Sequence, residues 1–187
     1  MIIAVCGLKR SGKNTTGSYL VENYGFKEYS FAKPIKEACC VLFDWSLDYI
    51  EEHKEDIDER WGISPRQALQ YLGTEDFQYN LPNQFPLFKE TVGRAFWVKR
   101  FENEYQKDKN SNYVITDFRF RHEEEIIKTY DSYTVKVINS KIEANDLHES
   151  ERYVQEMETD FCLLNNSSKE DLYYQIDGMM DYINKYR

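Results

Sequence analysis

The sequence predicts one α/β domain over residues 1–187, with a central parallel sheet of about five strands and helices on both faces. A β-branched, wholly apolar run stands near the N-terminus at Ile2–Cys6, and such runs are typical of a parallel strand covered on both faces. This run leads through a glycine-containing loop into a helical pattern. Further short apolar runs alternate with helical patterns along the chain, which favours a parallel sheet. A chain of 187 residues is long enough for one domain of this class.

The first helix is expected over residues 15–24, where Tyr19, Leu20 and Tyr24 recur at helical spacing before Gly25 ends the pattern. Residues 26–31 are expected to be a second short strand. A helix over residues 33–43 follows, with Pro34 in its first turn, where the missing N–H costs nothing.

The middle of the chain is expected to be mostly helical. Residues 46–60 are acidic and mixed, which indicates a helix and a loop facing solvent. Ser64 is a good N-cap and Pro65 a good first residue for a helix that continues to residue 72. Residues 80–86 are expected to be a loop and residues 88–105 one long helix. The helical spacing of its aromatic stripe favours a core position over a base-stacking surface; the stripe is Phe96, Trp97, Phe101 and Tyr105.

The last part of the chain again alternates between strands and helices. Strands are expected at residues 113–116, 133–138 and 161–164, and helices at residues 122–130, 148–157 and 169–186. No internal repeat, low-complexity tract or linker interrupts this pattern, which supports one domain.

Composition and charge exclude several classes of function. The net charge of -9 argues against broad electrostatic binding to nucleic acid or to an anionic membrane, since such binding needs Lys and Arg. No apolar stretch approaches the roughly 20 residues that span a bilayer, and the N-terminus does not resemble a signal peptide, so we expect an intracellular protein. The cysteines lack ligand-like spacing and are expected to be reduced core thiols; they are Cys6, Cys39, Cys40 and Cys162.

The segment from Gly7 to Thr15 carries the strongest chemical signal. It reads GxxxxGK followed by Asn-Thr and lies between a buried strand and a helix, which is the context of a phosphate-binding loop. Its glycines let backbone N–H groups converge on phosphate oxygens at a helix N-terminus. We therefore expect this segment to bind the phosphates of ATP, with Lys13 at the β- and γ-phosphates; its binding residues are Gly7, Lys9, Arg10, Ser11, Gly12, Lys13, Asn14 and Thr15.

A magnesium ion is expected beside these phosphates, but its protein ligand is left open. Asn14 stands where Ser or Thr normally offers a hydroxyl, while its amide oxygen and the hydroxyl of Thr15 are both hard ligands. Asp117 follows the strand at residues 113–116 at the sheet edge where ligands sit in α/β folds, so it could hold Mg²⁺ water or orient an acceptor. The alternative for Asp117 is a helix N-cap.

Several cations are candidates for holding phosphate. Arg119 and Arg121 follow Asp117 directly, and Arg66 lies in the first turn of its helix. Phosphoryl transfer depends on cations placed around the moving charge, although a surface ion pair is the alternative for any single Arg. Arg152, in the polar segment at residues 148–152, is a candidate cation on a lid that covers the phosphates. The alternative for this segment is an exposed, capped helix start.

An ordered set of motifs resembles the bacteriophage-type deoxynucleoside monophosphate kinases, which have a P-loop kinase fold. Besides the phosphate loop, it comprises Ser30-Phe31-Ala32-x-Pro34-x-Lys36, Pro65-Arg66-x-x-Leu69-Gln70-x-Leu72-Gly73-Thr74-Glu75, Val114-Ile115-Thr116-Asp117-x-Arg119-Phe120-x-x-Glu123 and His148-x-Ser150-Glu151. The resemblance implies transfer of the γ-phosphoryl of ATP to a deoxynucleoside monophosphate, with Mg²⁺, in the supply of DNA precursors. It also implies that Lys33, Arg66, Gln70, Arg119 and Glu151 shape the acceptor site. Asn14 and Lys33 both replace an Asp that this family favours, which leaves their roles open.

On these grounds we expect a phosphotransferase with Lys13, Arg66, Asp117 and Arg119 as its catalytic residues. Helices within residues 33–105 would bind the acceptor with Arg121 and Arg152 as additional phosphate ligands, and a lid at residues 140–158 would exclude water. The alternatives are a P-loop kinase of another small phosphorylated metabolite and a nucleotide-binding module without activity. The resemblance implies a location in the cytoplasm of a host cell, while the formation of a homodimer is left open.

Overall fold

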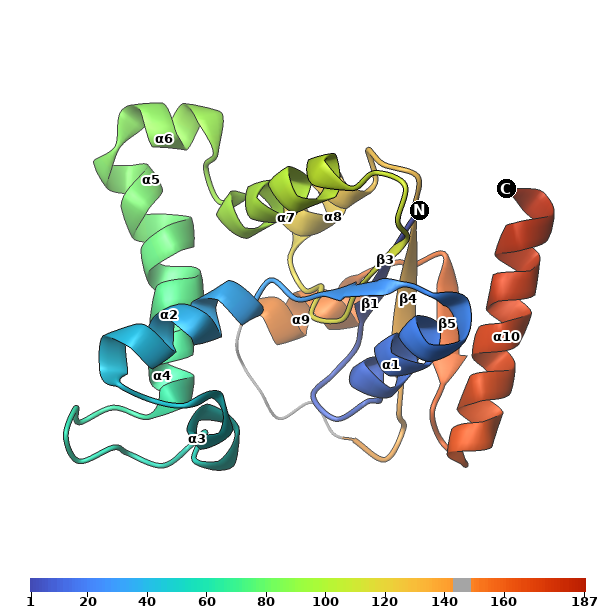
Figure 1. Cartoon of the computed structure of the whole chain (residues 1–187), viewed down its shortest axis with the longest axis horizontal. Coiled ribbons are helices and arrows are strands. Elements are labelled where there is room, and N and C mark those ends of the chain that lie inside the picture. The colour runs from blue at the N-terminus through green and yellow to red at the C-terminus, as the bar shows by residue number, and fades with distance from the viewer. Residues whose placement is uncertain (143–148) are drawn as a thin grey trace. The chain divides into compact units, whose positions relative to one another are not determined.

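A computed structural model describes residues 1–142 and 149–187, and the side chains of residues 149–151 lie outside this description. The described residues form two compact units (Figure 1). The first unit contains residues 1–30 and 105–187, and the second contains residues 31–104.

The first unit is built on a parallel sheet of five strands in the order β2-β3-β1-β4-β5. β1 lies in the centre, and all five of its residues are buried, because neighbouring strands flank it and helices cover both faces. This confirms the five-stranded parallel sheet expected from the sequence, although β2 is shorter than predicted. The strands are β1 (Ile2–Cys6), β2 (Lys27–Tyr29), β3 (Tyr113–Ile115), β4 (Ser132–Ile138) and β5 (Phe161–Leu164).

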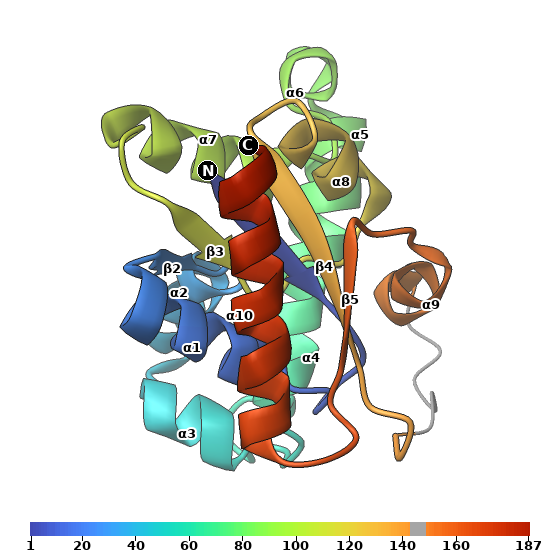
Figure 2. The ribbon, with the colours of Figure 1, turned by 90° about the vertical axis from the view of Figure 1, so that its right-hand side faces the viewer.

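Helices cover both faces of this sheet. Figure 2 shows α1 (Lys13–Tyr24) and α10 (Lys169–Tyr186) on one side, and α8 (Arg121–Ile127) and α9 (Glu149–Glu156) on the other. The main core lies between the sheet and the first pair of helices, where side chains such as Val5, Leu20 and Ile176 are fully buried. Burial of this apolar surface is the main force that holds the strands and helices together.

The cysteines are free, but only some are core residues. Cys6 in β1 and Cys39 in α2 are buried, Cys40 is partly buried and Cys162 is exposed. Burial raises the pKa of the Cys6 thiol to about 12, so Cys6 stays protonated and unreactive. The prediction of a core position is wrong for Cys162, because β5 is the edge strand and alternate residues of such a strand face solvent.

The second unit is helical in most of its length. Its helices are α2 (Lys33–Phe43), α3 (Leu47–Glu52), α4 (Pro65–Gln70), the π-helix η1 (Tyr71–Asn80), α5 (Leu81–Gln84) and α6 (Pro86–Thr91), and α7 (Phe96–Lys107) begins here and ends in the first unit. The helix predicted to start at Pro65 is present with the expected N-cap, since the Ser64 hydroxyl accepts from the N–H of Gln67. The Gln67 side chain in turn accepts from the N–H of Ser64, which completes a capping box that was not predicted.

Two predictions in this unit are wrong. The expected loop at residues 80–86 is mainly helical, because Pro82 and Pro86 lie in the first turns of α5 and α6, where no N–H is needed. The expected single helix at residues 88–105 is two helices, broken after Thr91. Gly93 has a left-handed φ of 54°, and its N–H donates to the carbonyl of Phe88, which ends α6. The aromatic stripe is core as expected at Trp97 and Phe101, which are buried.

The segment at residues 46–60 is predicted to be a helix and a loop facing solvent, and this orientation is wrong at Ile50 and Asp58, which are buried. α3 occupies residues 47–52 with Ser46 as its N-cap, in line with the expected helix. Asp58, however, is only 5% exposed, because its carboxylate accepts hydrogen bonds from Trp45 and Arg60 inside the unit.

Candidate active site

The loop between β1 and α1 has the backbone of a phosphate-binding loop. Gly7 and Gly12 have φ values of +148° and +115°, a region that L side chains rarely adopt. A Cβ at Gly7 would lie 2.4 Å from the Val137 carbonyl oxygen, and one at Gly12 would lie 2.5 Å from Asn165 Nδ2. Only glycine therefore fits at both positions. α1 begins at Lys13 without a side-chain cap, which leaves its first N–H groups available to an anion.

Buried polar atoms make this loop fit a polyphosphate. Ser11 is 1% exposed, and its Oγ has no hydrogen-bond partner among the described residues. Lys13 is also buried, and its Nζ donates to the carbonyl oxygens of Gly7 at 2.7 Å and Leu8 at 2.8 Å. A buried hydroxyl without a partner costs free energy, which a phosphate oxygen accepting from it would remove. Lys9 and Arg10 are exposed on the same loop.

Asn165 supports this loop and was missed by sequence reasoning. Its Nδ2 donates to the Ser11 carbonyl at 2.8 Å, and its N–H donates to the Ile138 carbonyl at 2.7 Å. Asn165 directly follows β5, so it lies at the sheet edge where β1 and β4 also end. The position of Asn165 directly after a predicted strand is the sign in the sequence of a site residue. The contact itself could not be predicted, because it joins residues 154 positions apart.

The residues after Lys13 differ in exposure. Asn14 is exposed and Thr15 is partly buried, so their oxygens are the accessible candidates for a metal. Thr16 is fully buried, and its hydroxyl donates to the Gly12 carbonyl at 3.2 Å. Within residues 1–142 and 149–187, no group of three His, Cys, Asp or Glu side chains could hold a metal ion, so any Mg²⁺ here would depend on these oxygens, on phosphate and on water.

Asp117 and Arg119 lie at the same edge of the sheet as the phosphate loop. β3 pairs with β1 in parallel, with Ala4 opposite Ile115, so the segments that follow both strands leave the sheet on the same side. Asp117 Oδ2 accepts from Ser30 Oγ at 2.8 Å. The alternative role of Asp117 as a helix N-cap is wrong, because α8 begins only at Arg121.

Glu123 holds this segment in place. Its Oε2 accepts from the backbone N–H of Arg119 at 2.7 Å and of Phe120 at 2.9 Å. The side chain is buried, and this burial raises the pKa of the Glu123 carboxyl to about 8 despite the two donors. Glu123 was recognised in a motif but not as a site residue. Its two hydrogen bonds fix the backbone position of Arg119.

Arg121 is the first residue of α8, and Arg152 lies on α9, within the predicted lid at residues 140–158. The Arg121 guanidinium lies over the Tyr153 ring at 5.6 Å, and the Tyr153 hydroxyl donates to Glu124. Arg121 therefore joins α8 to α9. Arg152 is exposed on α9, while the predicted contact of Glu151 rests on a side chain outside the described residues.

The predicted acceptor residues of the second unit lie on α2 and α4, which pack against each other. Lys33 is exposed at the first turn of α2, and Gln70 is partly buried at the end of α4. The packing is close, since a Cβ at Gly73 would lie 2.9 Å from Ile35 Cδ1. Arg66 is partly buried, and its Nη1 lies 2.9 Å from Glu55 Oε1.

No helix in the part of the chain that the structure describes is long and apolar enough to span a bilayer.

Comparison with known proteins links this chain to one family. A family model described as deoxynucleotide monophosphate kinase matches residues 1–52 and 42–176. A protein of Acanthamoeba polyphaga mimivirus named "Putative deoxynucleotide monophosphate kinase" is 36% identical, covering 97% of this chain and 96% of the relative. The deoxynucleotide monophosphate kinase of Escherichia phage RB69 is 24% identical, covering 96% and 99%. Shikimate kinase from Aquifex aeolicus matches in structure with a TM-score of 0.50 at 15% identity, covering 100% of both chains, which confirms the P-loop kinase fold.

Proposed function

The chain belongs to the deoxynucleotide monophosphate kinase family, and on this premise we propose how its residues perform phosphoryl transfer. As a member of this family it is a phosphotransferase that phosphorylates deoxynucleoside monophosphates. The donor in our proposal is ATP with Mg²⁺, and the product serves the supply of DNA precursors. The viral relatives support a location in the cytoplasm of the host cell.

The observation that carries the proposal is the phosphate loop with its buried, unsatisfied Ser11 hydroxyl. The ATP phosphates would accept from Ser11 Oγ and from the N–H groups at the start of α1. Lys13 Nζ would leave the Gly7 and Leu8 carbonyls and turn to the β- and γ-phosphates. Mg²⁺ would supply positive charge to these phosphates, and Asn14, Thr15 and Asp117 are the residues that would hold it.

On the acceptor side, cations would hold the monophosphate. Its phosphate would lie on Arg66 at the start of α4, with Lys33 and Gln70 beside it on α2 and α4. Arg119 and Arg121, with Glu151 and Arg152 from the lid, would complete the acceptor contacts and the charge stabilisation. An oxygen of the acceptor phosphate attacks the γ-phosphorus of ATP, and the bond to the β-phosphate oxygen breaks. The acceptor phosphate is ionised near neutral pH, so no general base is needed.

The donor half of the proposal is tested with Lys13→Ala. Turnover should fall by about 10³-fold, because Lys13 would stabilise charge that develops on the transferred phosphoryl group. Lys109→Ala removes an exposed lysine and should leave kcat within about twofold. Circular dichroism checks that both variants fold. Full turnover in a folded Lys13→Ala variant would contradict the assigned role.

The acceptor half is tested with Arg66→Ala. Loss of a charge-assisted hydrogen bond to phosphate should raise the KM for the deoxynucleoside monophosphate about 10- to 100-fold and leave the KM for ATP nearly unchanged. Arg100→Ala, at an exposed position of the same unit, is the matched control. Equal effects of the two substitutions on the acceptor KM would remove Arg66 from the site.

A further inference from the structure

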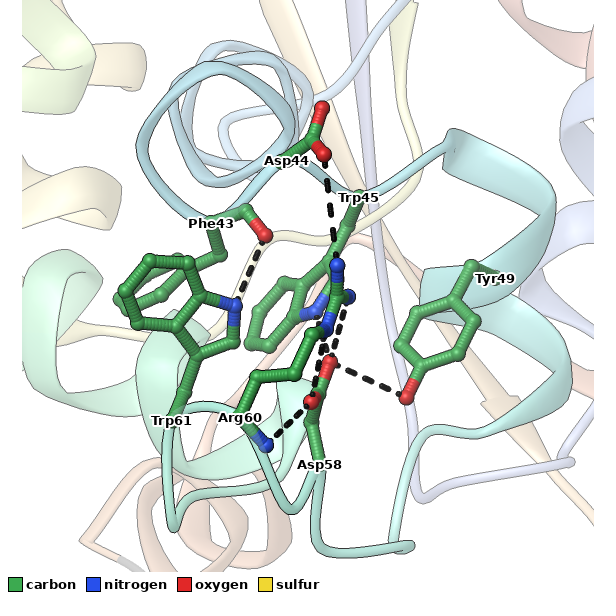
Figure 3. Close-up of polar contacts among 7 residues, drawn as sticks. All are labelled: Phe43, Asp44, Trp45, Tyr49, Asp58, Arg60 and Trp61. Carbon is green, nitrogen blue, oxygen red and sulfur yellow. Dashed lines mark hydrogen bonds and ion pairs between the residues drawn. The ribbon is translucent and has the colours of Figure 1, made fainter.

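Asp58 is the centre of a hydrogen-bonded cluster in the second unit, shown in Figure 3. Its Oδ2 accepts from Trp45 Nε1 at 2.7 Å, from Arg60 Nη2 at 2.7 Å and from the Tyr49 hydroxyl at 3.3 Å. Its Oδ1 accepts from the N–H and the Nε of Arg60 at 2.9 and 3.1 Å. A buried carboxylate with this many donors holds its neighbours in fixed positions.

The backbone of Asp58 closes a loop that leads to α4. The Asp58 N–H donates to the Ile63 carbonyl at 3.1 Å, and the N–H groups of Trp61 and Gly62 donate to the Asp58 carbonyl at 3.0 and 2.8 Å. Gly62 has a left-handed φ of 71°, which this tight turn requires. Ser64 then caps α4, so the loop determines where that helix begins.

Aromatic rings tie the loop to α2 and α3. Trp61 Nε1 donates to the Phe43 carbonyl at 2.9 Å, and the ring of Phe43 stacks on Trp45 with centroids 4.5 Å apart. Trp45 in turn stacks on Tyr49 at 6.0 Å. The carboxylate of Asp58 therefore lies where α2, α3 and the loop before α4 meet.

The segment between α3 and Asp58, which leads into this loop, contacts Arg66 twice. The Arg66 N–H donates to the Lys54 carbonyl at 2.9 Å, and the Arg66 guanidinium pairs with Glu55 at 2.9 Å. Both partners lie between α3 and Asp58. The position of Arg66 thus depends on how the segment from residue 53 to residue 64 is held.

We propose that Asp58 is a positioning residue for acceptor binding, which acts by holding the loop that places Arg66. This inference rests on the proposed function, in which Arg66 binds the acceptor phosphate. Asp58 itself is buried beside Trp45 and Arg60, so in this proposal it acts without contacting the acceptor. Its charge is balanced by Arg60, which also lies 4.0 Å from the exposed carboxylate of Asp44.

The test is a pair of substitutions in two backgrounds. Asp58→Asn keeps the side-chain shape but removes the charge, and it should raise the KM for the deoxynucleoside monophosphate about tenfold, with the KM for ATP unchanged. In an Arg66→Ala background the same substitution should change the acceptor KM less than about twofold, because the residue through which it acts is absent. An undiminished effect of Asp58→Asn in that background would overturn the proposal.

Asp44→Asn is the matched control, since it removes the other carboxylate beside Arg60 at a position 95% exposed. It should leave both KM values unchanged. A purely structural role of Asp58 would instead lower the fraction of folded enzyme, which reduces kcat at constant KM and contradicts the proposal. If Asp58→Asn does not fold, Trp45→Phe removes one donor to Asp58 and should raise the acceptor KM severalfold; an unchanged acceptor KM would overturn the proposal.

The wild-type enzyme separates this inference from the proposed function. If the wild type forms no deoxynucleoside diphosphate, the proposed function fails. If it does and the acceptor KM of Asp58→Asn equals that of the wild type, only the role of Asp58 fails.

Discussion

Two buried carboxylates in this chain show how surroundings decide the charge of an acid. Hydrogen bonds from the Arg60 side chain, together with that of Trp45, hold the pKa of Asp58 well below its usual range. Glu123 accepts from two backbone N–H groups, but no cation in the described part of the chain forms an ion pair with it, and burial raises the pKa of its carboxyl to about 8. Asp58 is therefore ionised at neutral pH, whereas Glu123 is mostly protonated.

The raised pKa of Glu123 predicts a pH dependence of stability. In the unfolded chain the carboxyl ionises near pH 4.5, whereas in the folded chain it keeps its proton up to about pH 8. The folded state therefore binds more protons between these values, and stability falls as the pH rises through this window. Glu123→Gln cannot ionise and keeps an acceptor oxygen, so from pH 5 to pH 8.5 it should lose less free energy of unfolding than the wild type, by up to a few kcal/mol.

Urea unfolding at several pH values measures this difference. The exposed Glu125→Gln on the same helix is the control and should follow the wild type. If the free energy of unfolding changes with pH equally in the wild type and in Glu123→Gln, Glu123 does not hold a proton in the folded state.

The contact between Asn165 and the phosphate loop predicts that a substitution of Asn165 weakens ATP binding. Asn165→Asp removes the donor to the Ser11 carbonyl and places a carboxylate beside the phosphate loop, so the KM for ATP should rise about tenfold. Asn166→Asp is the control, because the Asn166 Oδ1 accepts from the N–H and the hydroxyl of Ser140, and an aspartate can do the same. Steady-state kinetics at varied ATP checks both variants; equal KM values would contradict a supporting role for Asn165.

The phosphate loop could be predicted from the sequence because its contacts are local. Gly7, Gly12 and Lys13 lie within seven consecutive residues, and the motif itself specifies the backbone they form. The support from Asn165 and the burial of Asp58 could not be predicted in the same way. Both depend on tertiary contacts, and an acidic segment such as residues 46–60 gives no local sign that one of its carboxylates is buried.

At the scale of elements, two helical glycines predict opposite effects of the same substitution. A Cβ at Gly17 in α1 would lie 2.3 Å from Thr116 Cγ2, whereas one at Gly178 in α10 would meet nothing within 4 Å. Gly17→Ala should therefore destabilise the protein by about 1–3 kcal/mol through overpacking, and Gly178→Ala should stabilise it by about 0.5–1 kcal/mol. Chemical denaturation of both variants measures the two shifts, and a stabilising Gly17→Ala would contradict the close packing of α1 on the segment after β3.

Elements were predictable where pattern and caps agreed, as for β1 and for the helix that starts at Pro65. The errors arose at residues with two structural meanings. Pro82 and Pro86 indicate a loop, yet proline is also favoured in the first turn of a helix. Gly93 ends α6 with a left-handed backbone, whereas the apolar spacing around it continues as if one helix ran through.

At the scale of the whole molecule, the class of the sheet was predictable and the strand order was not. Buried apolar runs alternating with helices indicate a parallel sheet. The order β2-β3-β1-β4-β5 depends on which strands pair across long connections, which periodicity does not report. The division of the described residues into two units is likewise a property of tertiary contacts, and the prediction of one domain stays a prediction.

The central claim is that this chain phosphorylates deoxynucleoside monophosphates with ATP. The most direct test incubates the wild-type protein with ATP, Mg²⁺ and each of dAMP, dGMP, dCMP and dTMP, with shikimate and dephospho-coenzyme A as other acceptors, and follows products by anion-exchange chromatography. We predict equal amounts of ADP and deoxynucleoside diphosphate from at least one monophosphate and no product from the other acceptors. Formation of no deoxynucleoside diphosphate, with phosphorylation of another acceptor or none, would contradict the account.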